Sequence, residues 1–122
     1  ENPFTENQVT SDLARYERTI MLIREHEELA IGGLTLGWVY GALKRTKEMT
    51  SPGWIKKIEQ PLLLLNATKD KLVSPKENKK ICSQSNIVTI EDIESEHEIL
   101  METDLIRKKA WNAIDEFLKK TL

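Results

Sequence analysis

The sequence predicts an α/β protein whose second half forms a parallel sheet covered by helices. Two short apolar runs carry this prediction: four leucines at residues 62–65, and a β-branched run at residues 87–90. A helical pattern separates the runs, and a second helical pattern follows the later one. Strands that alternate with helices usually pair in parallel through right-handed crossovers. We therefore expect residues 61–122 to have the order β-α-β-α.

The first half of the chain is expected to be mainly helical. Residues 1–10 are polar and contain Pro3, which indicates a loop. A helix is expected to begin near Ser11-Asp12, which are good N-cap residues, and its pattern stops at Gly32-Gly33. A second helix is predicted from Thr35 to about Lys47, before a turn at residues 51–53. The apolar positions recur at spacings of three and four in both helices: Leu13, Tyr16, Ile20 and Ile23, then Leu36, Val39, Tyr40 and Leu43.

The four leucines admit two interpretations, a strand or the core of a helix. Pro61 in front, the polar turn behind and the short length favour a strand. Because the run does not alternate, that strand is expected to be buried on both faces. Ser74-Pro75-Lys76-Glu77 then resembles a capping box, opening a helix that runs to about Cys82. The last helix is predicted from about Asp104 to Lys120, with an apolar stripe of Ile106, Ala110, Ala113, Ile114, Phe117 and Leu118.

Two strands are too few to bury a strand as apolar as residues 62–65. We therefore expect the 122 residues to be part of a longer protein, with Glu1 at an internal position, and we expect the isolated chain to self-associate.

Composition narrows the classes of function. A net charge of −2 without a basic stripe argues against nucleic acid as a partner. The single cysteine, Cys82, excludes an internal disulfide and a cysteine-based metal site, and it suits the cytoplasm. Neither a signal peptide nor a bilayer-spanning run is visible. We expect no cofactor and no metal.

Asp70 and His97 are the candidate functional residues, because each follows one of the predicted strands. Taken singly, each has an ordinary interpretation, a turn aspartate and a solvated loop histidine. Taken together they gain weight, because neighbouring parallel strands bring their carboxyl ends side by side. A carboxylate there can bond one imidazole nitrogen, fix its tautomer and stabilise the imidazolium.

Other candidates are weaker. None of the serines lies in a Gly-x-Ser-x-Gly setting, and Cys82 lies in a predicted helix, where packing is the simpler role. His26 is expected at the solvated end of a helix. The glycine-rich residues 32–37 lack a preceding strand and a Gly-Lys-Ser/Thr ending, so a turn explains them better than a phosphate loop.

These segments resemble the α/β-hydrolase fold, in particular the lysophospholipase L2 and monoacylglycerol lipase group, also called S33-like serine aminopeptidases. Residues 61–73 are similar to the acid-bearing strand and loop of the family, and residues 96–100 to its histidine loop. Residues 31–38 resemble the Gly-Gly-Pro-Thr-x-x-Trp stretch of the helical cap, although Leu34 stands in place of the proline. The nucleophile elbow and the oxyanion loop of the family are missing from the chain.

The resemblance implies the C-terminal part of a serine ester hydrolase acting on lysophospholipids or monoacylglycerols. Residues 1–57 would be a segment of the helical cap, and residues 58–122 the last two strands with their helices. Asp70 and His97 would supply two members of the triad, so the fragment alone would be inactive. Trp38 and Tyr40 would contact the acyl chain, and core packing is the alternative for each of them taken singly. Whether the protein contacts the inner membrane is left open. The alternative to the hydrolase function is a non-catalytic interaction module.

Overall fold

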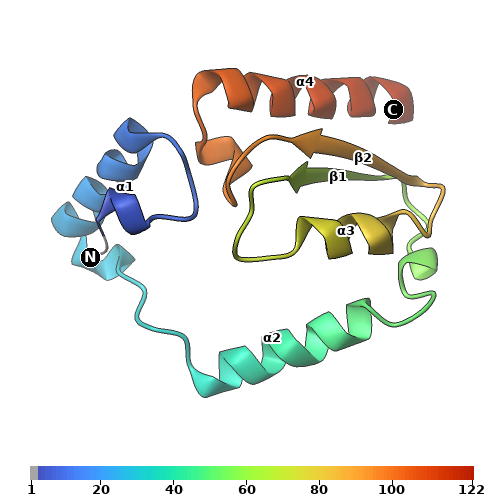
Figure 1. The fold of residues 1–122 in the computed structure, drawn as a ribbon, viewed down its shortest axis with the longest axis horizontal. Helices are drawn as coiled ribbons and strands as arrows, with labels where there is room; N and C mark the ends of the chain where they lie inside the picture. The colour runs from blue at the N-terminus through green and yellow to red at the C-terminus, as the bar shows by residue number, and fades with distance from the viewer. Residues whose placement is uncertain (1–2) are drawn as a thin grey trace.

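The computed structural model describes residues 3–122, which form a three-layer α/β arrangement with two helices beside it (Figure 1). Two parallel strands, β1 (Leu62–Ala67) and β2 (Val88–Ile93), make the sheet. Helix α3 (Pro75–Cys82) connects them and lies on one face, while α4 (Asp104–Thr121) covers the other. The β-α-β-α order expected of the second half is therefore present.

The register of the sheet brings the carboxyl ends of both strands to the same edge. Leu62 pairs with Val88 at one end and Ala67 with Ile93 at the other. Both strands run further than their apolar residues suggest. The expected strands ended at residues 65 and 90, but β1 continues through Asn66, whose amide donates to Asp92 of β2 at 2.9 Å. This polar pair is compatible with the ladder because Asp92 accepts the Asn66 amide N–H and also pairs with Lys79 of α3.

Burial of β1 is less complete than its sequence predicts. Leu62 to Leu65 are only half-buried, and full burial begins at Asn66 and Ala67. The physical reason is the number of strands: β1 pairs with β2 along one edge, and within residues 3–122 the sheet has no third strand to cover its other edge. The expectation that this run is buried on both faces is thus wrong for the chain as the structure describes it.

The first half contains α1 (Leu13–Glu25) and α2 (Leu36–Met49). Asp12 caps α1 by accepting a hydrogen bond from the backbone N–H of Arg15 at 3.0 Å, as the sequence suggested. The helix ends at Glu25, earlier than the glycine pair predicted, and a short 3-10 turn at Glu27–Leu29 follows. His26 lies at this solvated end, as expected.

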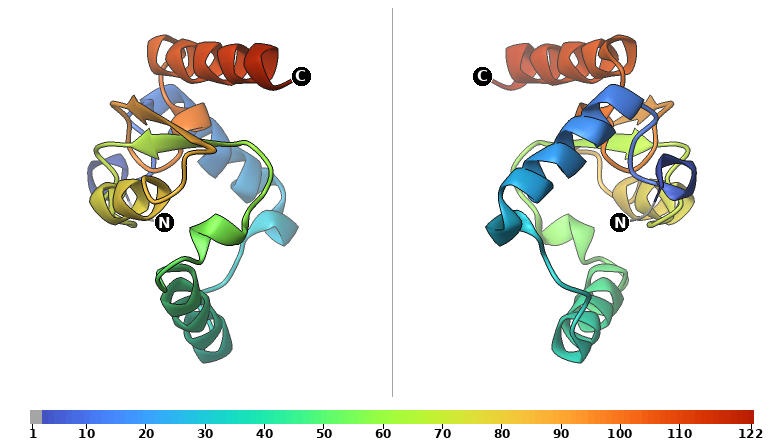
Figure 2. Two further views of the ribbon diagram at one scale, coloured as in Figure 1. Left: turned by 90° about the vertical axis from the view of Figure 1, so that its right-hand side faces the viewer. Right: turned by 90° about the vertical axis from the view of Figure 1, so that its left-hand side faces the viewer.

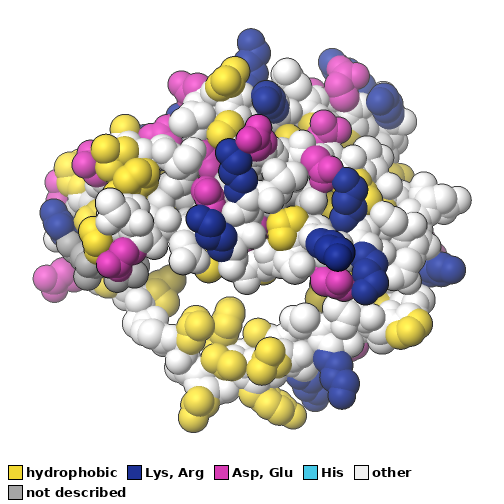
Figure 3. Space-filling model, in the orientation of Figure 1, with side chains coloured by type: hydrophobic (Ala, Val, Ile, Leu, Met, Phe, Trp, Pro, Cys, Tyr) yellow, Lys and Arg dark blue, Asp and Glu magenta, His cyan; other side chains and the backbone are white. Residues whose placement is uncertain are grey.

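Helix α2 lies on the far side of α3 from the sheet, and Figure 2 shows the same separation from two directions. Its apolar stripe is largely uncovered: Leu36 is 89% exposed, and Tyr40 and Leu43 are also exposed. Figure 3 shows hydrophobic side chains gathered over this helix. The helical periodicity was sufficient to predict the helix, but the surface that would cover the stripe is not among the described residues.

The remaining helices begin where local sequence signals place them. Ser74 caps α3 by accepting the N–H of Glu77 at 3.3 Å, with Pro75 in the first turn. Ala110 of α4 is completely buried, so the helix packs most closely against the rest of the molecule at this residue. None of the helices in residues 3–122 is both long and apolar enough to cross a membrane.

Candidate active site

Asp70 is placed by a tight turn at the carboxyl end of β1. Beyond the strand, the backbone N–H of Thr68 donates to the carbonyl of Ile93 at 2.8 Å, and that of Lys69 donates to the carbonyl of Ser95 at 3.0 Å. The N–H of Asp70 then returns to the carbonyl of Ala67 at 3.3 Å. The acid loop therefore stays bonded to the segment that leads to His97.

The carboxylate of Asp70 uses its two oxygens differently. Oδ1 accepts hydrogen bonds from the backbone N–H groups of Leu72 at 2.8 Å and Val73 at 3.1 Å, which closes an Asx turn. Oδ2 lies 2.7 Å from Nδ1 of His97. The expected interpretations of Asp70 were alternatives, a turn aspartate or a partner of His97, and this geometry combines them.

Burial and hydrogen bonding oppose each other in setting the charge of Asp70, whose side chain is only 4% exposed. Burial raises the pKa of the carboxyl. The hydrogen bond from His97 and those from the N–H groups of Val73 and Leu72 outweigh burial, so the pKa of Asp70 lies below its ordinary value. The group is therefore ionised at neutral pH and can only accept hydrogen bonds.

The ionised carboxylate of Asp70 determines which nitrogen of His97 carries the proton. Because Oδ2 of Asp70 cannot donate, Nδ1 of neutral His97 carries the proton, and the lone pair is on Nε2. The His97 side chain is 37% exposed, and Nε2 has no hydrogen-bond partner in residues 3–122. Chemically, the pair is an oriented base whose accepting nitrogen is open to an incoming hydroxyl.

The neighbouring glutamates have separate roles. Glu94 forms an ion pair with Lys69 at 3.0 Å, and Glu98 is exposed. Glu102, a residue that the sequence analysis did not single out, is completely buried and accepts the backbone N–H of Glu96 at 2.9 Å. Its position directly after the three apolar residues 99–101 was the only sequence signal for it.

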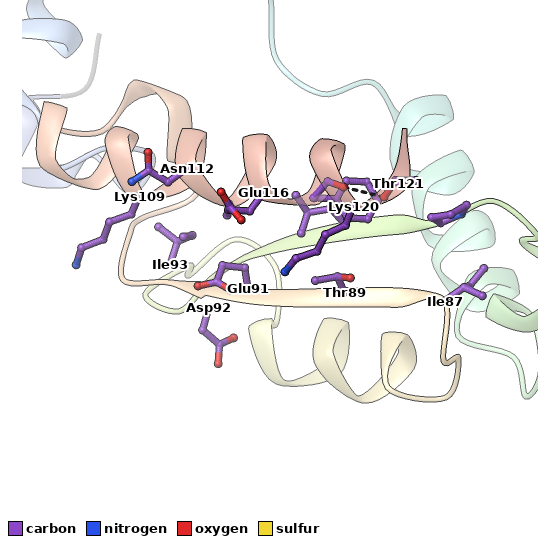
Figure 4. Close-up of a pocket in the computed structure, with 14 residues that line it drawn as sticks. Ile87, Thr89, Glu91, Asp92, Ile93, Lys109, Asn112, Glu116, Lys120 and Thr121 are labelled. Atoms are coloured by element: carbon purple, nitrogen blue, oxygen red, sulfur yellow. Dashed lines mark hydrogen bonds between the residues drawn. The ribbon is translucent and has the colours of Figure 1, made fainter.

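A groove in the described chain lies away from the acid–histidine pair. It measures about 790 Å³ and runs between β2 and α4, with Thr89 and Glu91 on one side and Asn112 and Glu116 on the other (Figure 4). Neither Asp70 nor His97 lines it. Trp38 and Tyr40 are exposed on α2, so the structure does not gather them around the acid–histidine pair.

Comparison with known proteins gives two matches. The family model described as "Serine aminopeptidase, S33" matches residues 2–104. A protein named "Probable lysophospholipase L2", from Haemophilus influenzae, is 31% identical over 113 residues, which is 92% of this chain and 36% of the relative. The chain thus spans about a third of that relative's length. No solved structure matches the chain significantly.

Proposed function

Because the chain belongs to the S33 serine aminopeptidase family, a group of α/β-hydrolases, we propose that it supplies the acid and the histidine of a longer serine hydrolase. The observation that carries the proposal is the 2.7 Å contact between Oδ2 of Asp70 and Nδ1 of His97. A buried, ionised carboxylate and a more exposed imidazole have the arrangement that a triad requires. The nucleophilic serine would come from outside these 122 residues.

The proposed substrates are carboxylic esters of lysophospholipids or monoacylglycerols. Support comes from the name of the Haemophilus influenzae relative and from the cap-like segment at residues 31–38. Within the longer enzyme, residues 1–57 would form part of a helical cap and residues 58–122 the end of the core sheet. The uncovered apolar stripe of α2 suits a cap that faces an acyl chain, with Trp38 and Tyr40 as contact residues.

Each residue of the pair has a defined step in the proposed mechanism. Nε2 of His97 takes the serine hydroxyl proton as the serine oxygen attacks the ester carbonyl carbon, and the carbonyl oxygen becomes an oxyanion. When the tetrahedral intermediate collapses, the bond to the alcohol oxygen breaks and Nε2–H donates its proton to the leaving alcohol. A water molecule then repeats the sequence on the acyl-enzyme. Throughout, Asp70 holds Nδ1–H and stabilises the imidazolium.

The proposed location is the cytoplasm, with peripheral contact to the inner membrane where lipid esters are found. The single cysteine supports a reducing compartment. Fractionation of cells that express the longer protein would test this, and recovery from the periplasm would contradict it.

Replacement of His97 tests the function directly, and the chain offers a matched control because it contains a second histidine, His26. In the longer protein, we expect His97→Ala to lower kcat for a lysophospholipid ester on the order of 10⁴-fold or more. His26→Ala, at the solvated end of α1, is expected to leave kcat unchanged. Near wild-type turnover by His97→Ala would exclude the hydrolase and favour the interaction module.

A further inference from the structure

Glu102 is a charged residue with no exposed surface at all. It follows the 3-10 turn Ile99–Met101 and directly precedes Thr103, the N-cap of α4. Burying a carboxyl group is costly unless donors replace the lost water. The donors around Glu102 therefore indicate what the residue holds in place.

The two oxygens of Glu102 bind two different segments. Oε1 accepts the backbone N–H of Glu96 at 2.9 Å, one residue before His97. Oε2 accepts the backbone N–H of Ser11 at 3.2 Å and also the Ser11 hydroxyl. The carboxylate thus joins the histidine loop to the segment that leads into α1, some ninety residues earlier in the chain.

The same early segment also binds the backbone that follows His97. The backbone N–H of Glu98 donates to the carbonyl of Val9 at 2.7 Å, and the hydroxyl of Thr10 donates to the carbonyl of Met101 at 2.7 Å. We call Glu102 with Val9, Thr10 and Ser11 the histidine clamp. Both residues flanking His97 thereby have their N–H groups fixed, one by Glu102 directly and the other by Val9.

The ends of the clamp are themselves anchored. The guanidinium of Arg15 donates to the backbone carbonyl of Glu102 at 2.8 Å, and it forms an ion pair with Asp104 at 2.5 Å in the first turn of α4. Arg15 also contacts Asp12, the cap of α1. The first turns of α1 and α4 are therefore tied together behind the histidine loop.

We propose that Glu102 is a positioning residue for His97, acting through the Glu96 N–H and the histidine clamp. This inference rests on the proposed function, because it concerns the same histidine. Asp70 fixes the rotation of the imidazole, but a hydrogen bond at Nδ1 does not by itself set the position of the backbone that carries the ring. A displacement of about 1 Å can cost on the order of 100-fold in rate.

The test measures kcat and KM of the longer protein with a soluble p-nitrophenyl acyl ester. Glu102→Ala removes every side-chain contact, and we expect it to lower kcat by about 100-fold while KM changes less than about twofold. Glu102→Gln keeps an oxygen that can accept the Glu96 N–H, so it should recover part of that loss, to about tenfold below wild type. Glu59→Gln is the matched control, since it makes the same replacement at an exposed position outside the histidine loop and should leave kcat within about twofold.

Unfolding midpoints separate positioning from loss of fold. If Glu102→Ala does not fold, Glu102→Gln and Ser11→Ala replace it, because Ser11→Ala deletes only the hydroxyl donor to Oε2. A fall in kcat for folded Glu102→Gln, with KM unchanged, supports the proposal. Equal kcat for Glu102→Gln and Glu59→Gln overturns it.

His97→Ala, measured beside these variants, distinguishes the two possible failures. If His97→Ala retains turnover, the proposed function itself fails. If His97→Ala is inactive while folded Glu102 variants keep wild-type kcat, the function stands and only the positioning role is lost.

Discussion

Oδ2 of Asp70 and Nδ1 of His97 lie 2.7 Å apart, although 27 residues separate them in the chain. The parallel register explains this contact. Ala67 and Ile93 end the two strands side by side, and the bonds from Thr68 and Lys69 extend the pairing into both loops. The acid and the histidine meet because their strands are neighbours that point the same way.

Replacing Asp70 by Asn should keep the turn but reverse the tautomer of His97. The amide oxygen can still accept the N–H groups of Leu72 and Val73, while its NH₂ group would face Nδ1. Nε2 would then carry the proton and could no longer accept one, so we expect kcat of the longer protein to fall on the order of 10⁴-fold. Asp115→Asn, at an exposed position of α4, is the control for charge loss. Full activity of Asp70→Asn would show that the contact is incidental.

The lowered pKa of Asp70 predicts a loss of stability in acid. In the folded state the pKa lies below the ordinary value, so the stabilisation is fully present above the unfolded-state pKa, near about pH 4. It is lost as the pH falls through the lower folded-state pKa. The decline of the thermal midpoint of unfolding below about pH 4 should therefore be shallower for Asp70→Asn than for wild type.

Other carboxyl groups with lowered pKa values, among them Asp12 and Asp104, contribute to the wild-type curve and remain in the variant. The difference between the two curves therefore isolates Asp70. Parallel curves throughout the acid range would contradict the assignment.

Local signals predicted much of this fold from the sequence. Asp12, Thr35 and Ser74 cap their helices through contacts within three residues, so the relevant physics is contained in a few neighbouring letters. Strand ends were less predictable. Asn66 and Asp92 look like turn residues singly, but they pair with each other in the parallel ladder and their side chains are hydrogen-bonded across the sheet.

The candidate site, too, could be predicted from the sequence only in part. Asp70 and His97 could be proposed because each follows an apolar run, and parallel strands align such positions. Glu102 could not, because its partners, Ser11 and the Glu96 N–H, come from a distant segment and from the backbone. A sequence displays neither backbone donors nor the burial of a carboxyl group.

Ala110 offers a test of how tightly α4 is packed, since it is the only residue of that helix classed as buried among those described. Ala110→Leu adds three carbons where no exposed surface remains, so we expect the free energy of unfolding in urea to fall by about 1–3 kcal/mol. Lys108→Leu introduces the same side chain at an exposed position of α4 and should change it by less than about 0.5 kcal/mol. Equal stability of the two variants would mean that α4 is free to shift away from the sheet.

The uncovered apolar surface predicts self-association of the 122-residue chain. Ile31 is 97% exposed and Leu36 is 89% exposed, and the stripe they begin continues along α2 to Leu43. Apolar surface of this kind is removed from water when two chains meet. Light scattering should therefore give a mass above that of a monomer, rising with concentration.

Leu43→Lys places a charge on this stripe and should shift the population towards the monomer, because burying an unpaired ammonium group is costly. Gln84→Lys is the matched control, since it adds the same charge at an exposed position two residues after α3. Equal effects of the two lysines would assign the association to net charge rather than to α2. A monomer at every concentration would mean that the stripe remains in water, and the association predicted from it would be wrong.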